Sequence, residues 1–330
     1  MNIEKRLRFS DAIEKFKNIT VMVIGDVMLD EYVTGKVKRI SPEAPVPVLN
    51  FTSSRYTAGG ASNVALNVKS LGCKTYMSGV TGSDSSGHKI ETFLEENGVN
   101  TEPLVKAEDR MTTVKRRFTT SHQQLLREDI ENTDPISSDI EHKILEELNK
   151  KIDDLDAVIL SDYQKGVLVT PSFIQKIISI CERHGVVITI DSKATTLEAF
   201  KGATFVKPNN LELENAVNIK IKDEKSLEEA GQKYLSMSQA KVLLVTRGSD
   251  GISVFRNGRA REDFPAAKVQ VYDVSGAGDT VISTCTLGLV AGLTMNEAVE
   301  LSNIAAAVVI SKFGTSVVTA DELIEKVHEE

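Results

Sequence analysis

The sequence predicts a three-layer α/β/α sandwich around a mostly parallel central sheet, with a small β lid. Short β-branched runs alternate with amphipathic stretches of helical period, which is typical of a parallel sheet covered by helices on both faces. Several of these stretches end near a glycine, as helices often do, at Gly72, Gly185 and Gly292. Two other stretches interrupt the alternation and have the pattern of strands outside the main sheet.

The strands and helices of the main layers follow from residue patterns. Apolar, β-branched runs predict buried strands at 21–25, 157–161, 186–191, 204–207 and 242–246. Apolar residues at helical spacing predict helices at 61–71, 138–150, 171–184, 227–236, 279–291 and 296–312. Because strands and helices alternate along much of the chain, we expect the strands to pair in parallel.

The lid is predicted from residues 31–52 and 111–128. The first stretch contains three prolines, which a sheet edge tolerates better than a central strand. The second contains the alternating run 113–118, and both look like antiparallel strands. The length of 330 residues leaves one or two domains open, but neither a fixed-period repeat nor a linker rich in Pro, Gly or Ser divides the chain. We therefore expect 1–330 to form a single domain.

Composition and charge indicate the kind of protein and disfavour some partners. Hydrophobic residues make up 41% and charged residues 26%, as in a soluble globular protein. The net charge of −8 disfavours a nucleic-acid partner, and the mixed charges of residues 1–18 disfavour a secretory signal. No apolar run predicts a membrane span. Cys73, Cys181 and Cys285 have no metal-ligand spacing and fit reduced thiols. We expect a cytoplasmic protein with no membrane partner.

The strongest single feature is the segment 273–279, which reads Asp-Val-Ser-Gly-Ala-Gly-Asp and runs directly into a helical pattern. Small residues let the backbone approach a ligand, and the helix directs free N–H groups towards it. We therefore expect Gly276, Ala277 and Gly278 to bind an anion. A carboxylate here fits phosphoryl transfer, in which a base takes a proton from the attacking hydroxyl. Asp279 is the candidate base.

The same segment also has a purely structural interpretation. Asp279 or Ser275 would cap a helix, and the glycines would shape a turn. Two commoner phosphate motifs are excluded, because the sequence has no GxxxxGK[ST] and because 276–281 lacks the third small residue of the dinucleotide fingerprint.

Four motifs, in the same order along the chain, resemble the ribokinase-like (PfkB) carbohydrate kinases. Residues 273–279 are similar to the family's C-terminal signature, and 59–63, Gly-Gly-Ala-Ser-Asn, to its N-terminal sugar-binding signature. Residues 208–212 resemble its Asn-x-x-Glu motif, and 246–251 its nucleotide-binding strand and turn. The likeness extends from about Ile19 to about Thr319. It implies the ribokinase-like fold and an ATP-dependent sugar kinase.

The resemblance also implies roles for individual residues. The substrate would be bound by Asp30, Gly59, Gly60, Asn63, Arg127, Asp162, Lys165 and Lys193. The nucleotide would be bound by Asn209, Glu212, Thr246, Gly248, Asp250, Gly251 and Asn303, the last near the adenine. Glu212 would hold Mg²⁺ indirectly, and Asp273 with the 314–316 turn would help to bind a monovalent cation such as K⁺.

Within the family, the likeness is greatest to the kinases that phosphorylate C1 of D-glycero-β-D-manno-heptose 7-phosphate. It rests on the segments 25–30, 39–48, 126–129 and 160–168. The resemblance implies a step in making nucleotide-activated heptose for lipopolysaccharide or another surface glycan. A substrate phosphate needs cationic partners. The available cations are Arg39, Lys115, Arg116, Arg117, Arg127, Lys165 and Lys193, but only one face of a strand at 115–117 can point inward.

Two positions depart from the family pattern. Ser192 stands between Asp191 and Lys193 where the family usually has Pro, and Gln164 stands where Gly is usual. The chain also has no His-x-Gly-His motif for adenylyl transfer. We therefore expect a separate adenylyltransferase and phosphatase to act downstream. By likeness to several relatives, we expect a homodimer joined through the lid strands.

Three other functions stay open at this stage. The nearest is another kinase of the same fold that acts on ribose, fructose, a nucleoside or a different sugar phosphate. A catalytically silent nucleotide- or sugar-binding protein is disfavoured by the intact Asp279, Gly276, Gly278 and Asn209. A nicotinamide-dependent oxidoreductase is disfavoured by the missing dinucleotide fingerprint.

Overall fold

The computed structural model describes residues 1–121, 123–194, 196–267, 269–312, 314 and 316–330. Its strands are β1 (Thr20–Gly25), β2 (Val27–Ile40), β3 (Pro47–Gly60), β4 (Lys74–Gly82), β5 (Leu104–Ala107), β6 (Thr113–Thr119), β7 (Gln124–Ile130), β8 (Ala157–Asp162), β9 (Val187–Ser192), β10 (Phe205–Val206), β11 (Val242–Thr246), β12 (Ile252–Arg256) and β13 (Glu262–Phe264). Its α-helices are α1 (Ile3–Lys15), α2 (Ala61–Ser70), α3 (Ser85–Glu96), α4 (Ser138–Lys151), α5 (Pro171–His184), α6 (Asn210–Val217), α7 (Glu224–Ser238), α8 (Ala277–Val290), α9 (Met295–Ile310) and α10 (Ala320–Glu329). Short 3₁₀ turns are η1 (Phe16–Asn18), η2 (Ile152–Asp154), η3 (Leu197–Phe200) and η4 (Gly248–Asp250).

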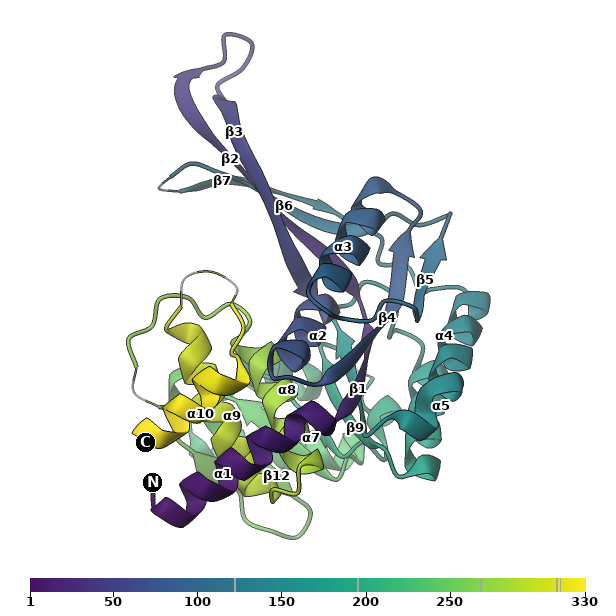
Figure 1. The fold of residues 1–330 in the computed structure, drawn as a ribbon, viewed down its shortest axis with the longest axis vertical. Coiled ribbons are helices and arrows are strands. Elements are labelled where there is room, and N and C mark those ends of the chain that lie inside the picture. The colour runs from purple at the N-terminus through teal and green to yellow at the C-terminus, as the bar shows by residue number, and fades with distance from the viewer. Residues whose placement is uncertain (122, 195, 268, 313, 315) are drawn as a thin grey trace.

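The strands form two sheets. The larger sheet has nine strands in the order β13-β12-β11-β10-β9-β8-β1-β4-β5, and the smaller has the order β3-β2-β6-β7. In the larger sheet the strands from β11 to β5 pair in parallel, while β12 and β13 are antiparallel at one edge. Helices pack on both faces of this sheet (Figure 1). The predicted α/β/α sandwich is therefore confirmed.

Strand β1 separates two hydrophobic cores. Side chains alternate along a strand, so Val21 and Val23 pack into one core while Met22 and Ile24 pack into the other. The first core includes apolar side chains of α1, α2, α8, α9 and α10. The second includes those of α4, α5, α6 and α7. This double burial explains why the central strands are continuous apolar runs.

The predicted strands and helices of the main layers all occur, with ends that differ by a few residues. Several elements were not predicted: α1, α3, α6, α10, β4, β5, β12 and β13. Helix α1 has only three fully buried residues, Phe9, Ala12 and Ile13, so its apolar stripe is narrow. Strand β4 contains Ser78, Gly79 and Gly82, which weaken the apolar signal of a buried strand.

The smaller sheet projects from the body, and its long strands β2 and β3 extend furthest (Figure 1). Strands β2 and β3 pair antiparallel, as do β6 and β7. Strands β2 and β6, whose pairing was not predicted, pair with each other in parallel. Both strands start at the body, since Met28 pairs with Thr113, and the chain between them returns through α2, β4, α3 and β5.

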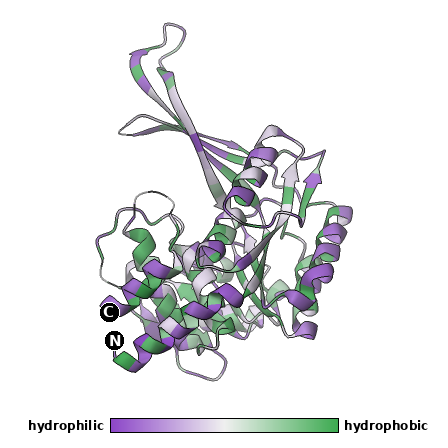
Figure 2. Ribbon diagram, in the orientation of Figure 1, coloured by the Kyte–Doolittle hydropathy of each residue, from purple (hydrophilic) through white to green (hydrophobic). Residues whose placement is uncertain are grey.

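Hydropathy differs between the two parts of the molecule. Hydrophobic colour is concentrated in the strands and helices of the body, while the projecting sheet is mostly hydrophilic or neutral (Figure 2). Within the described part of the chain, no helix is both long and apolar enough to cross a membrane.

Candidate active site

A cavity of about 1110 Å³ lies where several parallel strands end. Its walls include Asp162 at the end of β8, Asp191 in β9, Lys207 after β10 and Thr246 at the end of β11. The start of α8 closes another side of the same cavity. Ligands of open parallel sheets bind at this carboxyl edge, because the loops there diverge and leave a crevice.

Helix α8 points its N-terminus into the cavity. Gly276 precedes the helix with φ +83°, a conformation that glycine adopts without strain, and Ala277, Gly278 and Asp279 form the first turn. Among the described residues, no side chain caps this end of the helix. The first amides and the positive end of the helix dipole therefore favour an anion in the cavity.

Asp279 is buried, with 7% of its surface exposed, and both carboxylate oxygens accept hydrogen bonds. Asn63 Nδ2 donates to Oδ2 at 2.6 Å, and the Tyr163 hydroxyl donates to Oδ1 at 2.8 Å. Burial, followed by the charge of Asp191, raises the pKa of Asp279 to about 6, while the two hydrogen bonds oppose this rise. Near neutral pH this carboxylate is an anion in a fixed orientation.

Lys207 is a buried cation that sequence reasoning missed. Only 4% of its surface is exposed, and its Nζ lies 2.9 Å from Asp191 Oδ2. A Cβ placed on Gly278 would lie 3.3 Å from this Nζ, so the ammonium faces the first turn of α8. Burial alone would lower the pKa of Lys207, but the charge of Asp191 reverses this, and the net pKa is raised. The one available signal was a lysine directly after the buried strand β10.

Asn209 and Glu212 form a capping box at the start of α6. The amide N of Glu212 donates to Asn209 Oδ1 at 2.9 Å, and the amide N of Asn209 donates to Glu212 Oε2 at 2.8 Å. Both residues also line the cavity. Burial and then the charge of Asp191 raise the pKa of Glu212. The Asn-x-x-Glu motif thus has a structural role beside any role towards a ligand.

The other predicted nucleotide residues divide between the cavity and the surface. Thr246, Gly248, Gly251 and Asn303 line the cavity. Gly251 has φ +88°, and a Cβ there would lie 2.0 Å from the carbonyl oxygen of Phe264. The Asp250 carboxylate instead lies 3.7 Å from an Arg247 nitrogen and is 64% exposed.

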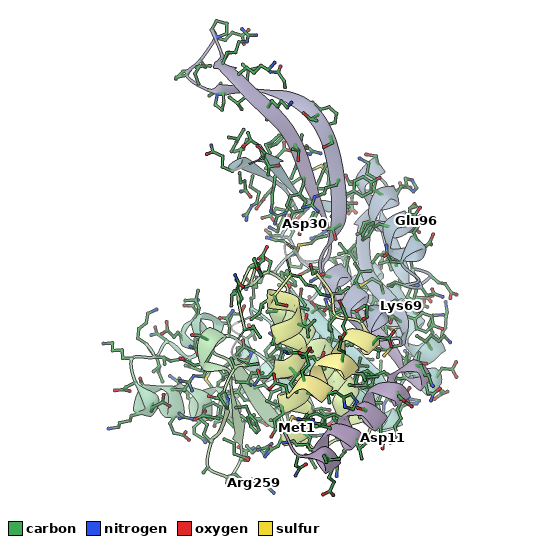
Figure 3. The ribbon with its side chains drawn as sticks, turned by 60° about the vertical axis from the view of Figure 1, so that its left-hand side comes forward. Met1, Asp11, Asp30, Lys69, Glu96 and Arg259 are labelled. Atoms are coloured by element: carbon green, nitrogen blue, oxygen red, sulfur yellow. The ribbon has the colours of Figure 1, made fainter. Side chains whose placement is uncertain are left out.

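Asp30, one of the predicted sugar residues, lies where the smaller sheet meets the body (Figure 3), and Gly59 and Gly60 are at the end of the neighbouring strand β3. Asp30 Oδ1 accepts a hydrogen bond from Arg117 at 2.9 Å. A Cβ on Gly59 would lie 3.0 Å from the Asp30 carboxylate, so a larger residue would displace it. Gly60 has φ +55°, and a Cβ there would lie 2.6 Å from the carbonyl oxygen of Asp26. Both glycines are therefore required for local packing, whatever they bind.

The loop after β8 is held by two buried carboxylates. Asp26 accepts hydrogen bonds from the amides of Tyr163, Lys165 and Val167 at 2.8–3.1 Å. Asp162 accepts from the amide of Gln164 at 2.7 Å and from the Ser192 hydroxyl at 2.6 Å. Burial, with the nearby Asp26, raises the pKa of Asp162 to about 6.

Both departures from the family pattern lie in this region. Gln164 has φ +58°, in the left-handed region that glycine adopts without strain, and its side-chain amide donates to the carbonyl oxygen of Lys193 at 3.0 Å. Ser192 bonds to Asp162 and accepts a hydrogen bond from the amide of Ala194. The two substitutions therefore help to connect the β8 and β9 loops beside the cavity.

The remaining candidates are spread over the site. The Lys193 ammonium lies 4.6 Å from the centre of the Tyr163 ring, and Lys193 lines the cavity. Lys165 pairs with Glu131 at 2.8 Å. Arg127 pairs with Asp129 through two nitrogens at 2.7 and 2.9 Å. Asp273 accepts a hydrogen bond from the Ser275 amide, and residue 315 of the proposed 314–316 cation turn lies outside the described residues.

Comparison with known proteins shows the family of this chain. Residues 18–322 match the sequence profile of the pfkB family carbohydrate kinases. The bifunctional protein HldE of Desulfatibacillum aliphaticivorans is 41% identical over 311 residues, which cover 94% of this chain and 63% of that protein. HldE of Syntrophotalea carbinolica is 39% identical, over 97% of this chain and 65% of that protein. The chain thus spans less than two thirds of the length of these curated relatives.

Solved structures agree on the fold. Arabidopsis thaliana ribokinase complexed with ribose and ATP has a TM-score of 0.75 and 19% identity, covering 94% of this chain and 98% of that one. Escherichia coli phosphofructokinase-2 in complex with potassium has a TM-score of 0.78 and 20% identity, with the same coverage. From the match to the family profile, together with this ribokinase-like fold, the chain belongs to the pfkB family of carbohydrate kinases.

Proposed function

We propose that this chain transfers the γ-phosphoryl group of ATP to the C1 hydroxyl of D-glycero-β-D-manno-heptose 7-phosphate, which gives the 1,7-bisphosphate. The observation that carries the kinase proposal is the buried Asp279 on the uncapped first turn of α8, inside a cavity that also contains Lys207. Membership of a carbohydrate kinase family supports ATP as phosphoryl donor. The choice of sugar rests on the resembling segments 25–30, 39–48, 126–129 and 160–168.

The proposed mechanism is an in-line displacement. Asp279 takes the proton of the acceptor hydroxyl while its oxygen attacks the γ-phosphoryl group. The amides of Gly276–Asp279 and the Lys207 ammonium stabilise the charge on the transferring group, and both are fixed before the substrates arrive. Asn63 keeps the base oriented by its hydrogen bond to Oδ2.

Mg²⁺ fits the acidic wall of this cavity. Asp191 and Glu212 line it, and burial, followed by the charge of Asp191, raises the pKa of Glu212, so the two carboxylates lie near each other. Mg²⁺ prefers carboxylate, phosphate and water oxygens, so Glu212 would hold it through water. When bound, the ion would neutralise phosphate charge. A K⁺ ion near Asp273 is a further part of the proposal, and comparing turnover in K⁺ with turnover in Na⁺ tests it.

The cations of the smaller sheet lie on two different faces. The register pairs Glu31 with Arg116 and Tyr32 with Arg117, so these two arginines point to opposite faces. The ring of Tyr56, which pairs with Glu31, lies 5.7 Å from Lys89 of α3, so the Arg116 face is the one turned towards α3.

We assign the substrate phosphate to the opposite face, which carries Asp30 and Arg117. The Tyr32 ring there lies between two guanidinium groups, those of Arg55 at 4.6 Å and Arg117 at 5.2 Å. Arg127 stands opposite Arg117 on β7. Arg55, Arg117 and Arg127 are the proposed phosphate ligands, and Arg55 was not among the predicted candidates.

A homodimer through the smaller sheet is also part of the proposal. Apolar side chains are exposed on its strands, among them Ile40, Phe51 and Leu126, each at least 60% exposed. Pairing two copies would cover them. Light scattering at micromolar concentration tests this directly, and a monomeric mass would contradict it.

The function is tested by assaying purified protein with ATP and a panel of acceptors. The panel contains heptose 7-phosphate, unphosphorylated heptose, ribose, fructose and fructose 6-phosphate, and ³¹P NMR identifies the product. We expect a new C1 phosphate signal from heptose 7-phosphate and the highest kcat/KM for that acceptor. A higher kcat/KM for another acceptor would replace the substrate assignment, and no ADP release with any acceptor would contradict a sugar kinase.

A further inference from the structure

Among the described residues that line the cavity, Tyr163 is the one tyrosine, and its hydroxyl bonds directly to the candidate base. The phenol oxygen donates to Asp279 Oδ1 at 2.8 Å, from the loop after β8. The other oxygen of the same carboxylate accepts from Asn63 on α2. Two donors from different elements therefore hold Asp279, on α8, from two sides.

Three further contacts fix Tyr163 itself. Its amide donates to the buried Asp26 at 2.8 Å, which anchors the backbone. The next residue, Gln164, turns the chain with φ +58° and ties the loop to the carbonyl oxygen of Lys193. The Lys193 ammonium in turn lies 4.6 Å from the centre of the Tyr163 ring. This cation–π contact helps to hold the ring in place.

We propose that Tyr163 is a positioning residue of the phosphoryl transfer, whose hydroxyl holds the Asp279 carboxylate in one orientation as its anion. This inference rests on the proposed function of Asp279 as base. Both carboxylate oxygens keep a free lone pair, and the pinned orientation directs one of them to the acceptor hydroxyl. Gln164, which departs from the family pattern, bonds to the carbonyl oxygen of Lys193, and the ammonium of Lys193 contacts the Tyr163 ring. This contact therefore helps to fix the position of the tyrosine.

The electrostatic surroundings of Asp279 agree with this role. The groups that act on it are Asp191 and Lys207 at the ends of neighbouring strands, with Asn63 and Tyr163 as hydrogen-bond donors. Glu212 lines the same cavity. Burial and Asp191 favour the protonated acid, which has no function as a base. The hydrogen bonds from Tyr163 and Asn63 and the charge of Lys207 favour the anion.

The test is Tyr163→Phe, which removes one oxygen atom and leaves the ring in place. We expect turnover to fall roughly 10-fold, with the KM for ATP changed less than about two-fold, because a hydrogen bond to a charged group is lost at the base and not at the nucleotide. The acidic limb of the kcat/KM profile should move upward by about one pH unit. In an Asp279→Asn background the same substitution should have almost no further effect.

Tyr76→Phe is the matched control. Tyr76 lies in β4, is 8% exposed and has the ammonium groups of Lys74 and Lys151 within 5.3 Å of its ring centre, but it does not line the cavity. This variant should keep the wild-type turnover and pH profile. An equal loss of turnover from Tyr163→Phe in the wild-type and Asp279→Asn backgrounds would overturn the inference.

A second readout does not depend on turnover. Carboxyl ¹³C NMR of aspartate-labelled protein, with the Asp279 signal assigned from Asp279→Asn, measures the pKa of this group directly. We expect a pKa about one unit higher in Tyr163→Phe than in the wild type. An unchanged pKa would overturn the inference even if the enzyme phosphorylates the proposed sugar. A raised pKa in a protein without kinase activity would reject the proposed function and keep the Tyr163–Asp279 coupling.

Discussion

The cavity at α8 and the smaller sheet differ in how far their charged side chains are exposed to water. In the cavity, Asp279 and Lys207 are 7% and 4% exposed, and each has a fixed polar partner. On the smaller sheet, the side chains of Arg117 and Arg127 are 19% and 48% exposed and pair with carboxylates of the same sheet. Charges interact strongly when water is excluded and weakly when it is present.

This difference separates two tasks. Preorganised buried groups stabilise a transition state because they need no rearrangement when the reaction occurs. Exposed ion pairs rearrange at low energetic cost, so Arg127 can exchange Asp129 for a phosphate. We therefore expect changes in the cavity to act on turnover and changes on the sheet to act on substrate affinity.

The largest effect is expected for Asp279→Asn. Loss of the base should lower kcat by roughly 10²–10⁴-fold, while ATP affinity changes little because the amides of α8 remain. Because burial raises the pKa of Asp279, the neutral amide is more easily buried, and the variant should unfold at no lower temperature. Quenched-flow kinetics, ATP titration calorimetry and thermal melts measure these quantities. Turnover close to wild type would remove Asp279 from its role.

Arg117→Ala tests the other region. Removal of a phosphate ligand should lower kcat/KM for the sugar phosphate by roughly 10- to 100-fold, mainly through KM. Arg116→Ala is the matched control, because Arg116 is on the opposite face and pairs with Glu31 and Glu128. It should change kcat/KM less than about threefold. Equal losses in both variants would break the assignment of the two faces.

The pH dependence of kcat/KM tests the cavity separately from the smaller sheet. The pKa of Asp279 is raised to about 6, and the base works only when deprotonated. As the pH falls below about 6, kcat/KM should therefore decrease about tenfold per pH unit. Asp162 also has a pKa raised to about 6, so the observed limb reflects both groups. Asp162→Asn should leave the limb in place if Asp279 controls it, and loss of the limb would assign it to Asp162.

The dependence of KM on ionic strength tests the smaller sheet separately from the cavity. We expect it to be the smallest of these effects. Raising the salt from roughly 0.05 M to roughly 0.5 M shortens the screening length from about 14 Å to about 4 Å. The KM for the sugar phosphate should rise a few-fold, since two of its proposed ligands, Arg55 and Arg127, are exposed, while kcat stays nearly constant. A fall in kcat with unchanged KM would contradict the assignment of substrate affinity to the smaller sheet and of turnover to the cavity.

The sequence predicted the body of the molecule better than the site. Strands such as β1 and β8 are continuous apolar runs because both faces are buried, so their signal is strong. The turn before α8 was predicted because glycines and an adjoining helix lie within one short segment. The parallel pairing of β2 with β6 was missed, because it depends on the path of the chain between them.

The missed site residues share one physical property. Lys207 and Tyr163 both contact residues far along the chain, since Tyr163 bonds to Asp279, 116 positions away, and the Lys207 ammonium faces the first turn of α8. Arg55 is similar, because its position relative to Arg117 depends on the register of three strands. Such contacts leave no local pattern, so only the folded chain brings them together.

The most direct test of Asp279 as the base is a structure of the complex with a non-hydrolysable ATP analogue and heptose 7-phosphate. We predict the acceptor oxygen within hydrogen-bond reach of Asp279, roughly 2.6–3.2 Å, and in line with the terminal phosphate. The 7-phosphate should contact Arg117. An acceptor hydroxyl bound away from Asp279, with another group beside it, would contradict the account.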